Sequence, residues 1–361
     1  MLWLLLACTP EESIEAAPER TLPADWGPYS VGVDTQWYTD ARGKEMVVDI
    51  WYPAIDGGEA LHNYDPFVLT VKGLNDAKPD MRGGPYPLIA FTHGLGGIRF
   101  QSANLNEFWA SHGFVVVAPD HVHNTLLDLD ESLLGIVALE RPGDVTSAID
   151  FVHAHERFGL MVDPEAPIGV AGHSFGAVTS LSVGGAEINV EQALAYCETH
   201  NGDGCSFFKD DLTTEGAIIG APDPRVVALA SLAPGAWFLF GDNGENLQNT
   251  VPALMIGATQ DTVLEYETEF LPTAERVASP KRVITLTDAG HWGFSDMCLL
   301  VPVFEDCQGE ESGYMNPDRT MSLTQFATTM HLGWYLTGDA AYAPELWENW
   351  TGEDFQVQSS D

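Results

Sequence analysis

A single serine lies in a local pattern that is typical of a catalytic nucleophile. Residues 168–171 form a short apolar run that predicts a buried strand, and the sequence Gly-His-Ser-Phe-Gly follows at 172–176. Residues 177–183 are compatible with a helix. A strand, a sharp turn and a helix make up a nucleophile elbow, which points the serine hydroxyl beyond the carboxyl edge of a sheet. We therefore predict Ser174 as a nucleophile, the alternative being a glycine-rich turn with a structural serine.

A serine hydroxyl is a weak nucleophile until a base accepts its proton, so the elbow predicts a histidine and an acid elsewhere in the chain. Asp261 closely follows a predicted strand at 252–257, and His291 follows another at 282–287. Functional residues of open α/β sheets gather beyond the carboxyl ends of the strands, and the order Ser, Asp, His is that of α/β-hydrolases. We predict His291 as the general base and Asp261 as the acid that orients it.

Other acids compete with Asp261 for this role. Asp288 is the main rival, although it lies only three residues before His291 and would need an awkward return of the chain. The weaker rivals are Glu265 and Asp242. Asp261 could also be the N-cap of a helix predicted over residues 263–278, which is a common role for Asp.

A glycine-rich loop follows the predicted strand 87–92, where an oxyanion hole is expected. The attacked carbonyl oxygen becomes an anion and needs two fixed N–H donors. We predict the backbone N–H of Phe175, directly after the nucleophile, and that of Leu95 in the loop. Further residues predicted to bind the substrate lie in this loop or directly after the base: His93, Gly94, Gly96, Trp292 and Phe294. The alternative for the loop is a structural turn before a helix.

Strands alternate with helices along the chain, and several predicted strands are continuous apolar runs. This pattern predicts an α/β fold of the α/β-hydrolase type, with a mostly parallel sheet covered by helices on both faces. The helices expected outside the elbow cover residues 100–112, 142–156, 263–278 and 321–336. No linker divides the chain, so we expect a single domain over 23–350 and a C-terminal tail at 351–361. Residues 187–217 are an insertion, either a cap over the site or a surface loop.

The chain carries a formal charge of −38 over its 361 residues, and the acidic residues are scattered rather than gathered in a tail. Such a surface repels nucleic acid and anionic membranes, so neither is expected as a partner. It suits a salty or extracellular setting. With 45% hydrophobic residues, the chain has ample material for a large core.

The N-terminus predicts export. Residues 1–22 combine a short apolar run with a tether rich in Glu, Ala and Pro, and Leu5-Leu6-Ala7-Cys8 is similar to a bacterial lipoprotein signal. In such a signal Cys8 would be lipidated and anchor the protein at the cell envelope. The run is short and lacks a preceding basic residue, so an ordinary secretion signal and a structural N-terminus are the alternatives. No later run is long enough to span a membrane.

Four cysteines remain beyond Cys8, and they lie in two close pairs. An even number in an exported chain favours disulfides, and among the three connectivities we prefer the local pairs Cys197–Cys205 and Cys298–Cys307. Each loop of this size would stabilise the fold by about 2.5 kcal/mol in the chain-entropy model. A zinc site is the alternative, but neither spacing is that of a zinc motif.

Taken together, these motifs resemble those of the platelet-activating-factor acetylhydrolase group, which includes bacterial esterases similar to dienelactone hydrolase. The likeness extends over residues 31–336, and its most specific motifs are His-Gly-Leu-Gly at 93–96 and Gly-His-Ser-Phe-Gly at 172–176. The other segments that carry it are 88–92, 110–116, 141–144 and 291–296. The resemblance implies an α/β-hydrolase fold, a serine nucleophile, no metal and short-acyl ester substrates. It assigns Ser174, His291, Leu95 and Phe175 the same roles as above.

The chain departs from this group at one point. The animal enzymes have their acid just after the sixth strand, whereas the corresponding residues 231–237 contain no acid here. The acid role therefore falls to Asp261 after the next strand. This departure favours a general bacterial esterase over a phospholipid-specific enzyme. Polyester-degrading cutinases share the segment Ser-His-Gly-Phe-Val at 111–115 and remain a possible relative.

The leading hypothesis is an exported serine carboxylesterase that acts on a small-molecule or lipid ester. A lipase or cutinase-like polyesterase is the second hypothesis, and a hydrolase-fold binding protein without catalysis is the third. No cofactor or metal is expected. His121 and His123 follow a strand end, and His153 and His155 would point to different faces of a helix. The sequence leaves the oligomeric state open.

Overall fold

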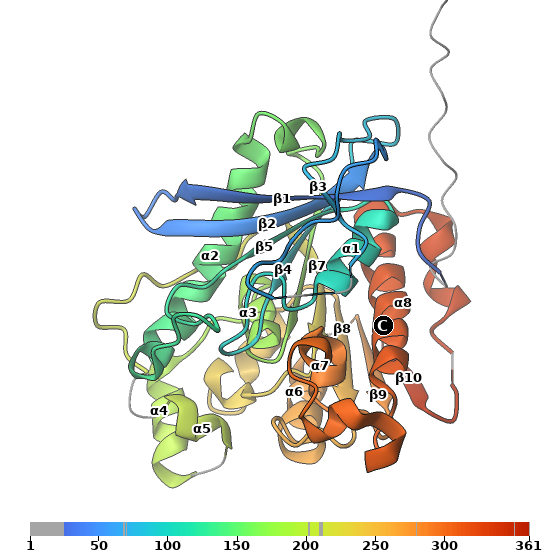
Figure 1. Cartoon of the computed structure of the whole chain (residues 1–361). Coiled ribbons are helices and arrows are strands. Elements are labelled where there is room, and N and C mark those ends of the chain that lie inside the picture. The colour runs from blue at the N-terminus through green and yellow to red at the C-terminus, as the bar shows by residue number, and fades with distance from the viewer. Residues whose placement is uncertain are drawn as a thin grey trace, which may run out of the picture.

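The computed structural model describes residues 25–360 except 68, 70, 201–202, 209–211, 279 and 350. The described residues form one ten-stranded sheet of order β10-β9-β8-β7-β6-β4-β5-β2-β1-β3 (Figure 1). The central strands run parallel to one another. They are β4 (Leu88–Thr92), β5 (Val115–Pro119), β6 (Ile168–His173), β7 (Val226–Leu232), β8 (Ala253–Ala258) and β9 (Lys281–Leu286). This sheet confirms the predicted fold class. The expected leader 1–22 with Cys8 lies outside the described residues.

Further strands complete both edges of the sheet. At one edge, β1 (Ser30–Thr39) pairs antiparallel with β2 (Glu45–Ala54), and the short β3 (Leu74–Asn75) lies parallel to β1. At the other edge, β10 (Phe355–Ser360) pairs antiparallel with β9. Within the segment 351–361 that was predicted as a C-terminal tail, residues Phe355–Ser360 instead extend the sheet.

Helices cover both faces of the sheet (Figure 1). α1 (Ala103–Ser111) and α8 (Pro317–Thr337) pack on one face, and α2 (Leu134–Ala154) and α3 (Phe175–Val183) pack on the other. Neighbouring residues of β4 point to opposite faces, so Ile89 and Phe91 join the α1–α8 core while Ala90 joins the α2–α3 core. The continuous apolar strands of the sequence are thus buried on both sides.

Two helices differ from the expectation. α2 begins at Leu134 rather than near Pro142, which lies in its interior. Proline removes a helical hydrogen bond, which is why the sequence favours a helix start there. Next to Pro142, the carbonyl of Leu139 accepts a hydrogen bond of 2.7 Å from the N–H of Gly220, a residue outside the helix. The predicted helix 263–278 is reduced to a π-helical turn at Tyr266–Phe270 followed by α6 (Leu271–Arg276).

Both predicted disulfides are present. Cys197 and Cys205 join α4 (Val190–Thr199) to α5 (Asp203–Phe208) within the insertion. Cys298 and Cys307 join α7 (Met297–Leu300) to the segment that follows it. Among the described residues, no helix has both the length and the apolar character that crossing a membrane requires.

Candidate active site

Ser174 lies on a strained turn between β6 and α3. Its φ of 58° and ψ of −121° are costly for any residue with a side chain. The turn is tight because a Cβ on Gly172 would lie 2.2 Å from the carbonyl oxygen of Gly176. A Cβ on Gly176 would lie 1.9 Å from the carbonyl oxygen of Thr92 on β4. The N–H of Ser174 donates to the carbonyl of Leu232 at 2.8 Å, which holds the strained residue against β7.

His291 and Asp261 form a buried pair near the ends of β9 and β8. The Nδ1 of His291 lies 2.7 Å from Oδ2 of Asp261. The other carboxylate oxygen, Oδ1, accepts hydrogen bonds of 2.8 Å from the N–H groups of Val263 and Leu264. Asp261 therefore caps the following turn and contacts the histidine at the same time. Nε2 of His291 is buried and has no hydrogen-bond partner among the described residues.

The three rival acids are exposed and lie away from this pair. Asp288 accepts a hydrogen bond of 2.8 Å from the side chain of Gln260. Glu265 accepts one of 3.2 Å from the hydroxyl of Thr268, and Asp242 is exposed before a 3₁₀ turn. The geometry thus pairs His291 with Asp261 rather than with any of these carboxylates.

Both predicted oxyanion donors border the nucleophile. Phe175 is the first residue of α3, where backbone N–H groups have no intrahelical acceptor. The N–H of Leu95 makes no hydrogen bond with any described residue. Gly94, the residue before it, has its Cα close to the elbow: an added Cβ would lie 3.4 Å from the Cβ of Ser174. The loop after β4 therefore approaches Ser174 closely.

A buried arginine to which the sequence analysis assigned no role contacts both segments that supply the predicted donors. The guanidinium of Arg141 donates to the carbonyl of His93 and, at 3.0 Å, to Oγ1 of Thr92. It also lies 4.4 Å from the centre of the Phe175 ring. Burial lowers the pKa of Arg141 to about 9, so the group still carries its charge at neutral pH. A desolvated cation thus lies directly behind the two segments that supply the predicted oxyanion donors.

A cavity of about 130 Å³ opens beside Ser174. Its wall is predominantly apolar, and both Ser174 and His291 line it. Phe208 from the insertion forms part of the wall and packs on Phe175, with 5.5 Å between the ring centres. The other lining residues are Gly94, Leu95, Gln101, Leu134, His173, Val178, Gly204, Ala236, Val263, Leu264 and Trp292. Residues 187–217 therefore contribute to the wall of the cavity.

Three of the five residues predicted to bind substrate are absent from the described lining of this cavity. Gly94 and Trp292 line it. His93 is fully buried behind the loop, where its Nδ1 contacts the carbonyl of Gly94 at 2.8 Å. Gly96 is not part of this lining, and a Cβ added to it would lie 3.4 Å from the side chain of Leu129. Phe294 is buried under the elbow, because the 3₁₀ turn after His291 directs it inward, with its ring centre 5.9 Å from that of His173.

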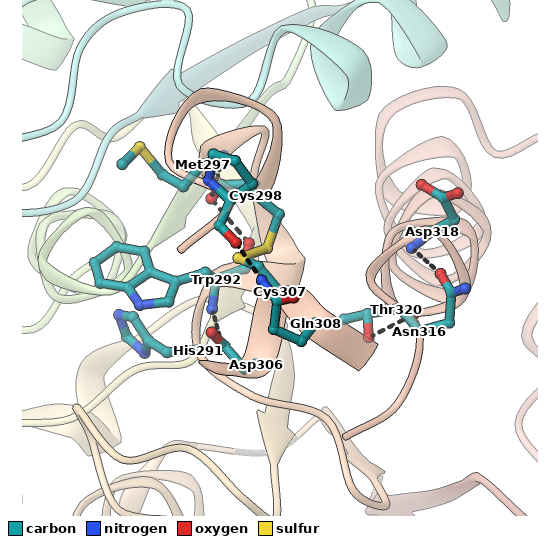
Figure 2. Close-up of a disulfide and its surroundings, with 12 residues drawn as sticks. His291, Trp292, Met297, Cys298, Asp306, Cys307, Gln308, Asn316, Asp318 and Thr320 are labelled. Carbon is teal, nitrogen blue, oxygen red and sulfur yellow. Dashed lines mark hydrogen bonds between the residues drawn. A yellow bond between two sulfur atoms is a disulfide. The ribbon is translucent and has the colours of Figure 1, made fainter. Parts of the chain in front are cut away.

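Asp306 is a second acid near the base that sequence reasoning missed (Figure 2). Its Oδ2 accepts a hydrogen bond of 2.8 Å from the N–H of Trp292, the residue after His291. Burial raises the pKa of Asp306 above its ordinary value, and the hydrogen bond from the Trp292 N–H and the neighbouring His291 only partly oppose this rise. Asp306 directly precedes Cys307, so the Cys298–Cys307 disulfide fixes the segment that presents this carboxylate (Figure 2).

We expect Asp306→Ala to lower the free energy of unfolding by about 1–2 kcal/mol, because the Trp292 N–H loses its acceptor. Asp306→Asn should cost clearly less, since an amide oxygen can still accept that hydrogen bond. Urea unfolding followed by tryptophan fluorescence measures both values. Equal losses for the two variants would show that the carboxylate charge, rather than the hydrogen bond, is what matters.

The histidines that we considered as metal ligands either contact other side chains or lie at separate places in the fold. His121 is buried, with Nδ1 2.9 Å from Asp144 and Nε2 2.8 Å from Thr92. His123 is exposed, and His153 and His155 lie at the C-terminal end of α2. In the part of the chain that the structure describes, no group of three or more His, Cys, Asp or Glu side chains is arranged to hold a metal ion.

Known proteins share parts of this chain and its fold. Residues 71–127 match the family "Platelet-activating factor acetylhydrolase, isoform II". A platelet-activating factor acetylhydrolase from Cavia porcellus is 28% identical over 126 residues, covering 28% of this chain and 29% of the relative. The chain thus spans less than a third of that relative's length. A solved ferulic acid esterase from Streptomyces cinnamoneus superimposes with a TM-score of 0.63 at 20% identity, covering 92% of this chain and 97% of that one.

The sheet order and the structural neighbour show that the chain has the α/β-hydrolase fold. Within that fold it is similar to the esterase group that includes the platelet-activating factor acetylhydrolases, which confirms the resemblance predicted from its motifs.

Proposed function

We propose that this protein is a serine carboxylic-ester hydrolase that works through an acyl-enzyme intermediate. The observation that carries the proposal is the convergence of three features on one apolar cavity: the strained Ser174, the His291–Asp261 pair and the loop of Leu95. Backbone strain of this kind clusters at functional sites. The esterases among its relatives and structural neighbours support the same reaction class.

In the proposed reaction, Oγ of Ser174 attacks the ester carbonyl carbon while Nε2 of His291 accepts the hydroxyl proton. The carbonyl oxygen becomes an oxyanion held by the N–H groups of Leu95 and Phe175. The bond to the alcohol then breaks, and His291 returns the proton to the leaving alkoxide. A water molecule repeats the sequence on the acyl-enzyme and releases the acid. Asp261 keeps the proton of His291 on Nδ1, so that Nε2 is unprotonated and can accept the proton of the serine.

We further propose that the natural acyl groups are short. The cavity of about 130 Å³ is smaller than the roughly 300–1,000 Å³ of sites that enclose drug-sized ligands. Bulky side chains close it, with Phe208 at the insertion and Trp292 beside the base. The ring of Phe304 stacks on the ring of Trp292, with 4.7 Å between the ring centres. These contacts restrict the length of the acyl chain that can be buried.

We expect activity on p-nitrophenyl esters to peak at about two to six acyl carbons. Each methylene buried inside the pocket gains roughly 0.8 kcal/mol, whereas further ones overpack it or stay in water. Trp292→Ala and Phe208→Ala should each move the peak of kcat/KM to longer chains, because each removes part of the wall. Leu160→Ala, at an exposed position remote from the cavity, is the matched control and should leave the profile unchanged.

Other profiles would favour the other functions. Activity that rises steadily to long acyl chains, or efficient attack on solid polyester, would indicate a lipase or polyesterase. Binding of esters without turnover would indicate a non-catalytic member of the fold.

We also propose that the protein is exported, either secreted or anchored at the cell envelope through a lipid on Cys8. The two disulfides support export, because such bonds persist in oxidising compartments. The anchoring residue lies outside the described residues, so lipidation rests on the sequence pattern alone.

A further inference from the structure

Two side chains without an assigned role link the three segments of the candidate site. Gln101, just before α1, and His173, just before Ser174, are both buried, with 2% and 0% of their surfaces exposed. Gln101 lies between the elbow and the loop after β4 that carries Leu95, which we call the oxyanion loop. His173 belongs to the elbow and lies beside the loop of His291, with 4.7 Å between the two ring centres.

The hydrogen bonds of these residues form one continuous chain. The N–H of Gly94 donates to Oε1 of Gln101 at 3.0 Å. Nε2 of Gln101 lies 2.9 Å from Nδ1 of His173, and Nε2 of His173 lies 2.9 Å from the carbonyl oxygen of His291. The chain therefore runs from the residue before Leu95, through the elbow, to the backbone of the base.

The direction of every hydrogen bond in this chain is fixed. Only the amide oxygen of Gln101 can accept from the Gly94 N–H, so its NH₂ group must donate to Nδ1 of His173. Burial and the neighbouring His291 lower the pKa of His173 well below its ordinary value, which keeps its ring neutral. A neutral ring that accepts at Nδ1 carries its proton on Nε2, and this proton points at the carbonyl of His291.

The residues next to Gln101 leave space for these hydrogen bonds and add a further one. A Cβ on Gly97 would lie 2.1 Å from Oε1 of Gln101, so only glycine leaves space for the amide. The carbonyl of Gln101 also accepts a hydrogen bond of 2.8 Å from the N–H of Asp296, which belongs to the same segment as His291. Gln101 is thus attached to the base loop by its backbone and to the other two segments by its side chain.

We propose that Gln101 and His173 are positioning residues, which hold the oxyanion loop and His291 in their places around Ser174. The inference rests on the proposed serine esterase function. Neither residue exchanges a proton with the substrate in this proposal; each acts through the atoms it holds. A displacement of about 1 Å in such a site can cost about 100-fold in rate, which sets the expected size of the effect.

The test compares Gln101→Leu, His173→Phe and the double variant on p-nitrophenyl butyrate. Leucine and phenylalanine keep much of the volume and the ring packing but remove the hydrogen bonds. Each single change should lower kcat by about 10- to 100-fold with KM nearly unchanged, because ground-state binding in the apolar cavity is retained. The kcat of the double variant should be no lower than that of the less active single variant, because either change alone already breaks the chain of hydrogen bonds.

Gln101→Glu tests the direction of the hydrogen bonds with little change in shape. A carboxylate still accepts from Gly94 but cannot donate to Nδ1 of His173, so kcat should fall as in Gln101→Leu. Gln325→Leu, which removes a buried amide on α8 remote from the site, is the matched control and should keep full kcat. Near-ultraviolet circular dichroism and thermal unfolding check that each variant is folded; if the double variant does not fold, Gln101→Glu decides alone.

Multiplicative losses in the double variant, or full kcat in Gln101→Glu, would overturn the positioning proposal. Ser174→Ala in the same assay separates this failure from that of the proposed function. If Ser174→Ala is inactive while the Gln101 variants keep full kcat, only the positioning proposal is wrong. If Ser174→Ala retains activity, the proposed function itself is wrong.

Discussion

Ser174→Ala is expected to lower kcat for p-nitrophenyl butyrate by about 10⁵- to 10⁶-fold, the size of effect seen when a serine nucleophile is removed from a cooperating triad. The acyl-enzyme cannot form without Oγ, so the remaining groups can only assist direct attack by water. KM should change little, because the apolar wall and the oxyanion donors are kept.

The fold should survive this substitution. Ser174 has a φ of 58°, which alanine tolerates no worse than serine, and the anchoring hydrogen bond to Leu232 uses the backbone N–H. Ser180→Ala, which removes a buried hydroxyl from the middle of α3 away from the cavity lining, is the matched control. It should retain wild-type kcat. Comparable turnover by Ser174→Ala and the wild type would mean that another group is the nucleophile.

Asp261→Asn is expected to lower kcat by about 10⁴-fold. An asparagine amide facing Nδ1 favours the tautomer with its proton on Nε2, and this nitrogen can then no longer accept from Ser174. Asp288→Asn is the matched control, because its exposed carboxylate contacts Gln260 and not His291. It should leave kcat close to the wild-type value.

The two asparagine variants are best compared through full steady-state kinetics at several pH values, with circular dichroism as a check on folding. Asp261 also caps the turn at Val263 and Leu264 through Oδ1, so some loss of stability is expected in addition. A larger loss of kcat in Asp288→Asn than in Asp261→Asn would show that the acid is assigned to the wrong residue.

The sequence could predict the central sheet and the elbow because their signals are local. Continuous apolar runs identify parallel strands that are buried on both faces, and glycines at 172 and 176 report a turn in which a Cβ would collide with backbone. Chain order and strand ends then bring Asp261 and His291 together, since all parallel strands present their carboxyl ends at one edge. The local cysteine spacing likewise predicted both disulfides.

Features that depend on tertiary packing could not be predicted in this way. Arg141, Gln101 and Asp306 act on segments that are distant in sequence, and no periodicity marks them. The interior Pro142 pointed to a helix start, yet α2 begins at Leu134. Residues 351–361 were expected to be a tail, yet Phe355–Ser360 pair with β9. Phe294 comes only two residues after Trp292, but the direction of one short turn separates the buried ring of Phe294 from the ring of Trp292 that lines the cavity.

Covalent labelling tests the central claim most directly. The wild-type protein and Ser174→Ala are each incubated with a fluorophosphonate, and the intact mass and the modified peptide are determined by mass spectrometry. We predict a single adduct on Ser174 in the wild type, and none in Ser174→Ala. An adduct on any other residue, equal labelling of both proteins, or no labelling of a folded wild type that hydrolyses esters would contradict a Ser174 nucleophile.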